Sequence, residues 1–152
     1  MDTDEEPRGG TIVVGVDGSD ASARALAWAV QEAELRHAPL HAVWAWDYMA
    51  GGSAWPGAAV EVTWDEEQQA EAVRTGLTSV IAEGTRGHER LQVQMTDVMG
   101  NPAAALMDAA EADEADMIVV GSRGRGGFKR LLLGSVSEQC ATHAHCPVVV
   151  VR

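Results

Sequence analysis

The sequence predicts an α/β fold, a doubly wound parallel sheet of five strands. Two short runs rich in valine and isoleucine, residues 11–17 and 117–121, have no polar residue in their interior. Strands with this pattern are buried on both faces and are typical of parallel sheets. Helical stretches alternate with the expected strands in the order βαβαβαβαβ, for which right-handed crossovers are the rule. As the most apolar internal strands, the two runs are expected to be neighbours at the centre of the sheet.

The N-terminal half supplies two strands and two helices. The first strand leads into a turn at Asp17-Gly18-Ser19-Asp20, where an N-cap can start an amphipathic helix. A connection rich in glycine and proline follows the second strand, and a connection of that length usually has a function or is mobile. The elements expected here are a strand at 11–17, a helix to about residue 37, a strand at 40–46, a connection at 47–62 and a helix at 65–83.

The C-terminal half supplies the other three strands. One run alternates apolar with polar residues, which is typical of a strand at a sheet edge with one face in water. Asn101 and Pro102 form a helix-start signal, an N-cap followed by proline in the first helical position. The elements expected here are a strand at 91–98, a helix to about residue 113, a strand at 117–121, a helix at 135–143 and a strand at 147–151.

Length and charge exclude several classes of protein. The 152 residues fit one domain, 11–152, after an acidic tail, 1–10, which we expect to be disordered. No apolar run approaches the ~20 residues of a membrane span, and the start of the chain does not resemble a secretory signal. We therefore expect a cytoplasmic protein with two free thiols. The net charge of −12 argues against binding to nucleic acid or to an anionic membrane, and an anionic ligand would need local positive potential.

A glycine-rich segment, residues 121–137, is the strongest candidate for an anion site. Gly121 and Gly124 would let backbone N–H groups approach an anion, and Gly134-Ser135 opens a helix whose N-terminus favours phosphate. Serine hydroxyls at Ser135 and Ser137 could add donors. The segment also holds four of the eleven cations of the chain: Arg123, Arg125, Lys129 and Arg130. On these residues alone, a flexible surface loop with solvated charges stays an equal alternative, because the segment matches neither a Walker A motif nor a G-x-G-x-x-G fingerprint.

The spacing of these residues resembles the ATP-binding branch of the universal stress protein family. That branch has a glycine, two residues, a glycine, nine residues, a glycine and then serine or threonine, and Gly121, Gly124, Gly134 and Ser135 stand at this spacing. The resemblance extends over residues 11–152, with a Val-Gly-Val-Asp-Gly-Ser opening, Gly-Asn-Pro before the third helix and a Cys-Pro-Val-Val-Val-Val ending. It implies a fold like that of the adenine nucleotide alpha-hydrolases, with strand order 3-2-1-4-5.

The resemblance also implies which residues bind ATP. It places Asp17 at the nucleoside, Gly15 along the pocket and the backbone of Val43 at the adenine. Around the ribose and phosphates it places Gly121 and Gly124. The residues between and beside them, Ser122, Arg123 and Arg125, belong to the same part of the site. The distal phosphates would lie at the helix start, against Gly134, Ser135, Val136 and Ser137. Without the family context, Asp17 is equally well explained as a turn former, and Ser19 is better explained as an N-cap.

The implied function is that of a regulatory ATP-binding switch in the stress response. The resemblance implies a homodimer through the last strand, Val148 to Val151, and a regulatory protein partner that the sequence does not identify. Efficient turnover is not expected, since no general base or phosphoryl-transfer lysine accompanies the loop. The alternatives are a slow Mg²⁺-dependent ATPase, with Asp17 as an indirect metal contact, a nucleotidyl-transferase-like enzyme, and a dimerisation protein without nucleotide.

Three further groups of residues have simpler explanations. Cys140, His143, His145 and Cys146 have a spacing that could hold a metal, but a cysteine before a buried strand is usually a small hydrophobe. Trp44 and Trp46 share one face of the second strand, which favours a core role over stacking on a base. The histidines His37, His41 and His88 have no carboxylate or nucleophile at a telling spacing and are expected to be surface or core residues.

Overall fold

The computed structural model describes residues 9–47, 65–124 and 133–152. Within these ranges the elements follow the expected order. Their bounds are β1 Ile12–Gly15, α1 Asp20–Arg36, β2 Leu40–Trp46, α2 Glu66–Gly84, β3 Val93–Met99, α3 Pro102–Ala112, β4 Met117–Gly121, α4 Ser135–His143 and β5 Val148–Val151.

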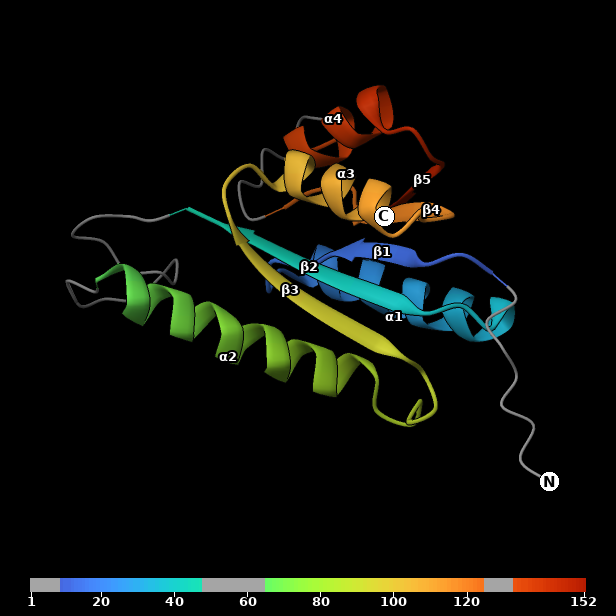
Figure 1. Ribbon diagram of the computed structural model, residues 1–152, viewed down its shortest axis with the longest axis horizontal. Coiled ribbons are helices and arrows are strands. Elements are labelled where there is room, and N and C mark those ends of the chain that lie inside the picture. Colours follow the sequence, from blue (N-terminus) through green and yellow to red (C-terminus); the bar gives the residue numbers. More distant parts are fainter. Residues whose placement is uncertain (1–8, 48–64, 125–132) are drawn as a thin grey trace.

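The five strands form one all-parallel sheet in the order β3-β2-β1-β4-β5. This confirms the predicted fold class, including the central pair β1 and β4. Helices α1 and α2 cover one face of the sheet, and α3 and α4 cover the other (Figure 1). The carboxyl ends of all five strands therefore lie at one edge of the layers, where the connections to the helices begin.

The core consists of two apolar clusters, one on each face of the sheet. Alternate residues of β1 divide between them: Ile12 and Val14 pack under α1 and α2, and Val13 packs under α3 and α4. Trp44 is only 3% exposed within the first cluster, which supports the core role expected from the sequence. No helix among the described residues is long and apolar enough to cross a membrane.

The third strand differs from the expected pattern. It lies at the edge of the sheet, as predicted, but its apolar positions are not uniformly covered. Val93 packs against the α1–α2 cluster, whereas Met95 and Met99 on the same face are 46% and 51% exposed. The strand is therefore wet along much of its length.

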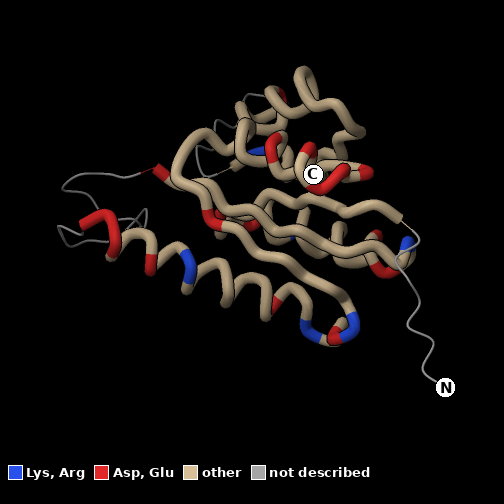
Figure 2. The backbone as a smooth tube through the Cα atoms, in the orientation of Figure 1, with Lys and Arg blue, Asp and Glu red and all other residues tan. Residues whose placement is uncertain are grey.

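The outer surface of the described domain is rich in carboxylates. Figure 2 shows acidic residues spread along the helices, including the first turn of α2. The predicted connection at 47–62 and most of the predicted tail lie outside the described residues. Gly10, however, is attached to the domain, because its backbone N–H donates to Asp116 Oδ2 at 2.9 Å.

Candidate functional site

Asp17 lies in the turn between β1 and α1, at the carboxyl edge of the sheet. Its Oδ1 accepts a hydrogen bond from the Ser19 backbone N–H at 2.9 Å, so the carboxylate does form the turn. Ser19 in turn caps α1 by accepting from the Ser22 N–H, as expected. The other oxygen, Oδ2, lies only 3.1 Å from the point where a Cβ on Gly124 would stand. One oxygen of Asp17 thus builds the turn, and the second faces the glycine segment.

The two described ends of the glycine segment are tied together at Ser122. Its carbonyl oxygen accepts the Gly134 N–H at 2.6 Å and lies 3.3 Å from the hydroxyl oxygen of Ser137. The Ser122 N–H donates to Val151 O of β5. Residues 122–124 and the start of α4 therefore form one structure beside Asp17, although they are separated by residues 125–132.

Among the described residues, no side chain caps the N-terminus of α4. Helices α1, α2 and α3 are capped by Ser19, Asp65 and Asn101, whereas the N-cap of α4 is Gly134, which has no side chain to accept a bond. The first intrahelical bond runs from the Glu138 N–H to Gly134 O, so it leaves the amides of the three preceding residues free to bind a ligand: Ser135, Val136 and Ser137. Free amides and the helix dipole together favour an anion at this point.

Two of the predicted site glycines have a packing role. A Cβ on Gly121 would lie 2.9 Å from the backbone carbon and oxygen of Ala21, so this glycine lets α1 approach the end of β4. A Cβ on Gly15 would meet Leu106 Cδ1 of α3 at 3.1 Å. Gly124 differs from both, because its nearest neighbour in that direction is the carboxylate of Asp17.

Val43 is poorly placed to meet a ligand. Its side chain is 2% exposed, and its carbonyl oxygen accepts the Val16 N–H at 3.0 Å. Ala45, two residues further along β2, is partly buried on the same face and lies closer to the carboxyl edge. The contact at Val43 was implied by the family resemblance, and it stays a prediction.

The hydroxyl groups and cations of the segment are not equivalent. Residue Ser137 as a whole is 1% exposed, and its hydroxyl already lies within hydrogen-bond distance of two carbonyl oxygens, which disfavours its predicted role as a phosphate donor. Ser135 and Arg123 are exposed at the edge of the sheet. Arg125, Lys129 and Arg130 lie outside the described residues.

Comparison with known proteins decides the family of this chain. Residues 10–152 match the model of the universal stress protein family. The chain belongs to that family. A universal stress protein of Mycobacterium tuberculosis (strain ATCC 25618 / H37Rv) is 39% identical over 147 residues, which are 96% of this chain and 46% of the relative. One of Thermus aquaticus is 36% identical over 93% of this chain and 98% of its own length. The chain thus spans about half the length of the mycobacterial relative and nearly all of the other.

Solved structures of universal stress proteins have the same fold. One in complex with cAMP has 27% sequence identity and a TM-score of 0.70, and it covers 95% of this chain and 98% of its own. One from Archaeoglobus fulgidus in complex with dAMP has 25% identity and a TM-score of 0.66, over 95% of this chain and 99% of its own.

The cysteines of this universal stress protein are free thiols, and Cys140 is inaccessible. Burial, followed by the nearby Cys146, raises the pKa of Cys140 from its ordinary value of 9.0 to about 11. Burial also raises the pKa of Cys146. Thiols that resist ionisation are poor metal ligands, and no metal-binding group of histidines, cysteines and carboxylates occurs among the described residues.

His41 is the residue that sequence reasoning explained least well. It is 5% exposed, its Nδ1 lies 2.5 Å from Asp113 Oδ2, and its Nε2 lies 2.8 Å from Thr96 Oγ1. These partners are 72 and 55 residues away in the chain, so no local spacing could reveal them.

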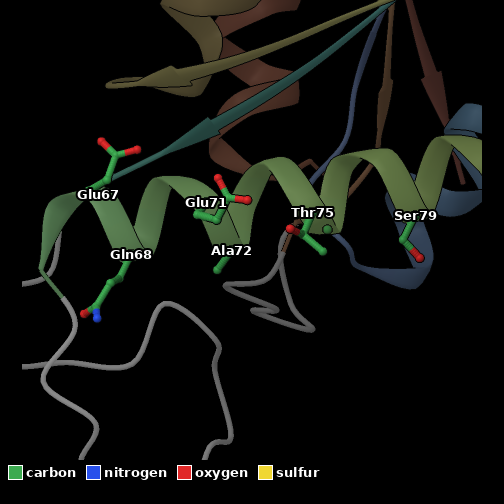
Figure 3. Close-up of a pocket in the computed structure, with 7 residues that line it drawn as sticks. Glu67, Gln68, Glu71, Ala72, Thr75 and Ser79 are labelled. Carbon is green, nitrogen blue, oxygen red and sulfur yellow. The ribbon is translucent and has the colours of Figure 1, made fainter.

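A groove along α2 is a poor site for a nucleotide. Figure 3 shows Glu67 and Glu71 projecting from this helix, and both carboxylates line the groove. Its other described lining residues are Gln68, Ala72, Thr75, Gly76 and Ser79. The described lining supplies two carboxylates and no cation. Arg74 pairs with both carboxylates, at 3.4 and 3.8 Å, so it is not free to attract a phosphate. The carboxyl edge around Asp17 and α4 remains the candidate site.

Proposed function

We propose that this universal stress protein binds an adenine nucleotide, with ATP as the physiological ligand, at the carboxyl ends of β1 and β4. The observation that carries the proposal is the uncapped start of α4 beside Gly124 and Asp17. In a chain of net charge −12, free helix amides are the groups that can bind phosphates without a large cationic surface. The related structures in complex with cAMP and dAMP support an adenine nucleotide as the ligand class.

The roles of the individual residues follow from their places. The amides of Ser135 and Val136 would hold the distal phosphates, and Gly124 would let the backbone pass close to the ribose and the proximal phosphate. Asp17 Oδ2 would accept from a ribose hydroxyl or hold a water of an accompanying Mg²⁺. At the end of β2 we propose the backbone of Ala45, in place of Val43, as the adenine contact, because the Val43 carbonyl is already used.

We further propose that the domain, residues 11–152, acts as a nucleotide-dependent switch in the cytoplasm rather than as an efficient enzyme. Its two cysteines are free thiols, as a reducing compartment would keep them. Homodimerisation through β5 is part of this proposal. That strand ends the sheet, consists of four valines and leaves each of them partly exposed, so a second copy could pair with it. Light scattering on a size-exclusion column tests this directly, and a monomer at high protein concentration would contradict it.

Calorimetric titration of the purified protein with ATP, AMP and cyclic AMP tests the binding proposal. ATP is expected to bind most tightly, because only its distal phosphates reach the start of α4. Gly124→Val is expected to abolish binding and leave the fold intact, since its side chain would be forced against the carboxylate of Asp17. Equal affinity for ATP and AMP would contradict the role of α4, and release of ADP during the titration would favour the slow ATPase.

A further inference from the structure

A hydroxyl, an imidazole and a carboxylate form a line across β2, β3 and α3. His41 is the second residue of β2, Thr96 lies near the middle of β3, and Asp113 is the C-cap of α3. Alternation along the strands places His41 and Thr96 on the face that α3 covers, because Val43 and Val98 of the same strands belong to that cluster. The line is formed by residues that the nucleotide site does not use.

The carboxylate decides which ring nitrogen of a neutral imidazole carries the proton. An ionised Asp113 can only accept a hydrogen bond, so the His41 Nδ1 atom, 2.5 Å away, carries the proton of the neutral ring. Nε2 is then the acceptor, and the Thr96 hydroxyl donates to it across 2.8 Å. Thr96, His41 and Asp113 thus stand in the order of a nucleophile, a base and a group that orients the base. Both contacts lie within the hydrogen-bond distances that such an arrangement requires.

Thr96 is less deeply buried than the base. The His41 side chain is 6% exposed and that of Asp113 is 21% exposed, while Thr96 is partly exposed on the edge strand. Within the described part of the chain no strand pairs with the outer edge of β3. The bonds from Leu40 N–H to Gln92 O and from Gly100 N–H to Trp46 O show that the even residues of β3 face β2. The N–H of Asp97, next to Thr96, therefore points to the free edge, where it could stabilise an oxyanion.

We propose that Thr96, His41 and Asp113 form an acyl-transfer site for small activated esters, distinct from the nucleotide site. Thr96 Oγ1 attacks the ester carbonyl, and its proton passes to His41 Nε2. The tetrahedral intermediate collapses with cleavage of the bond to the leaving alcohol, which takes the proton from His41. Water then attacks the acyl-threonine with His41 as base, and this releases the carboxylic acid and restores the hydroxyl. Asp113 is a positioning residue, since it touches only His41.

The site is remote from the nucleotide. His41 stands four residues before Ala45 on an extended strand, a separation of about 13 Å at ~3.3 Å per residue. A change at Thr96 is therefore expected to leave ATP binding unaltered, and failure of either proposal does not affect the other.

The test is covalent labelling of the full chain with a fluorophosphonate, in which a reactive hydroxyl displaces fluoride. Peptide mass spectrometry is expected to find the adduct on Thr96, with the label kept in Thr96→Ser and absent in Thr96→Val, which preserves side-chain shape. His41→Gln is expected to slow labelling and p-nitrophenyl acetate hydrolysis by about 100-fold or more, the lower end of what a general base typically contributes. Asp113→Asn should slow both, and Asp113→Glu should restore part of the rate.

His88 provides a matched control. Its Nδ1 pairs with Glu34 Oε1 at 2.7 Å, a second histidine–carboxylate pair. His88→Gln is expected to label at the wild-type rate. Absence of a Thr96 adduct in the wild-type protein after prolonged incubation overturns the proposal. So does equal labelling of wild type and a His41→Gln variant whose circular dichroism shows the native fold.

Discussion

The start of α4 allows a sharp test of nucleotide binding, because a capping side chain can be placed where the protein has none. Gly134 has φ −75° and ψ 167°, an extended conformation open to any residue, so Gly134→Asp does not strain the backbone. A Cβ there would stand 3.3 Å from Arg123 Cα and from Ser122 O, which requires shifts of a few tenths of an ångström. The new carboxylate would then accept from the amides of Val136 or Ser137, in the position we propose for a phosphate.

The expected magnitudes follow from the lost contacts. A hydrogen bond to a charged group contributes about 1.5–3 kcal/mol. Loss of two such bonds costs about 3 kcal/mol or more and weakens ATP binding at least about 100-fold. Stability of the free protein should stay the same or rise, because an aspartate cap exceeds glycine by a few tenths of a kcal/mol and adds a favourable interaction of about 0.3–1 kcal/mol with the helix dipole.

Calorimetry and thermal unfolding measure the two effects separately. Asn101→Asp is the matched control, since it adds the same charge at the N-cap of α3, where Asn101 Oδ1 already accepts the Ala104 N–H. This variant should keep nearly the wild-type affinity for ATP. Binding of ATP to Gly134→Asp within about twofold of wild type would refute the assignment of phosphates to α4, given that each tenfold step represents ~1.4 kcal/mol.

Three further outcomes are expected. Gly121→Ala should destabilise the fold by about 1–3 kcal/mol, since the new Cβ would lie 2.9 Å from the Ala21 backbone. Differential scanning calorimetry should show a Tm that is lower by about 2–4 °C per kcal/mol. An unchanged Tm would contradict the packing role. Arg123→Ala should weaken ATP binding about two- to fivefold at low salt. The difference from wild type should shrink at high ionic strength, because salt screens exposed charges. A loss of affinity that is independent of salt would exclude a simple charge effect. Because the pKa of Cys140 rises from 9.0 to about 11 on folding, the unfolded chain loses this proton first, and the free energy of unfolding should fall as pH rises between those values. Urea titrations should show that the free energy of unfolding falls less steeply with pH in Cys140→Ala than in the wild type. Equal slopes of that free energy against pH would contradict the burial effect.

Local pattern predicted the fold well, and it predicted part of the site. Runs such as 117–121, the caps Ser19 and Asn101 and the turn at Asp17 depend on residues within a few positions, so their periodicity and chemistry are visible in the sequence. The glycine spacing led to the family, which the comparison confirmed. The ends of β1 and β3 were less well predicted, because strand ends depend on where the neighbouring strand stops pairing.

The sequence by itself determined the order of elements, the parallel sheet and the family. Only the tertiary structure decided what the individual residues do. It showed that Gly121 admits the backbone of Ala21, that Ser137 holds the start of α4, and that His41 lies between Thr96 and Asp113. The reason is physical: periodicity records only which face of an element is buried. A hydrogen bond between residues 72 positions apart exists only after the strands and helices have packed.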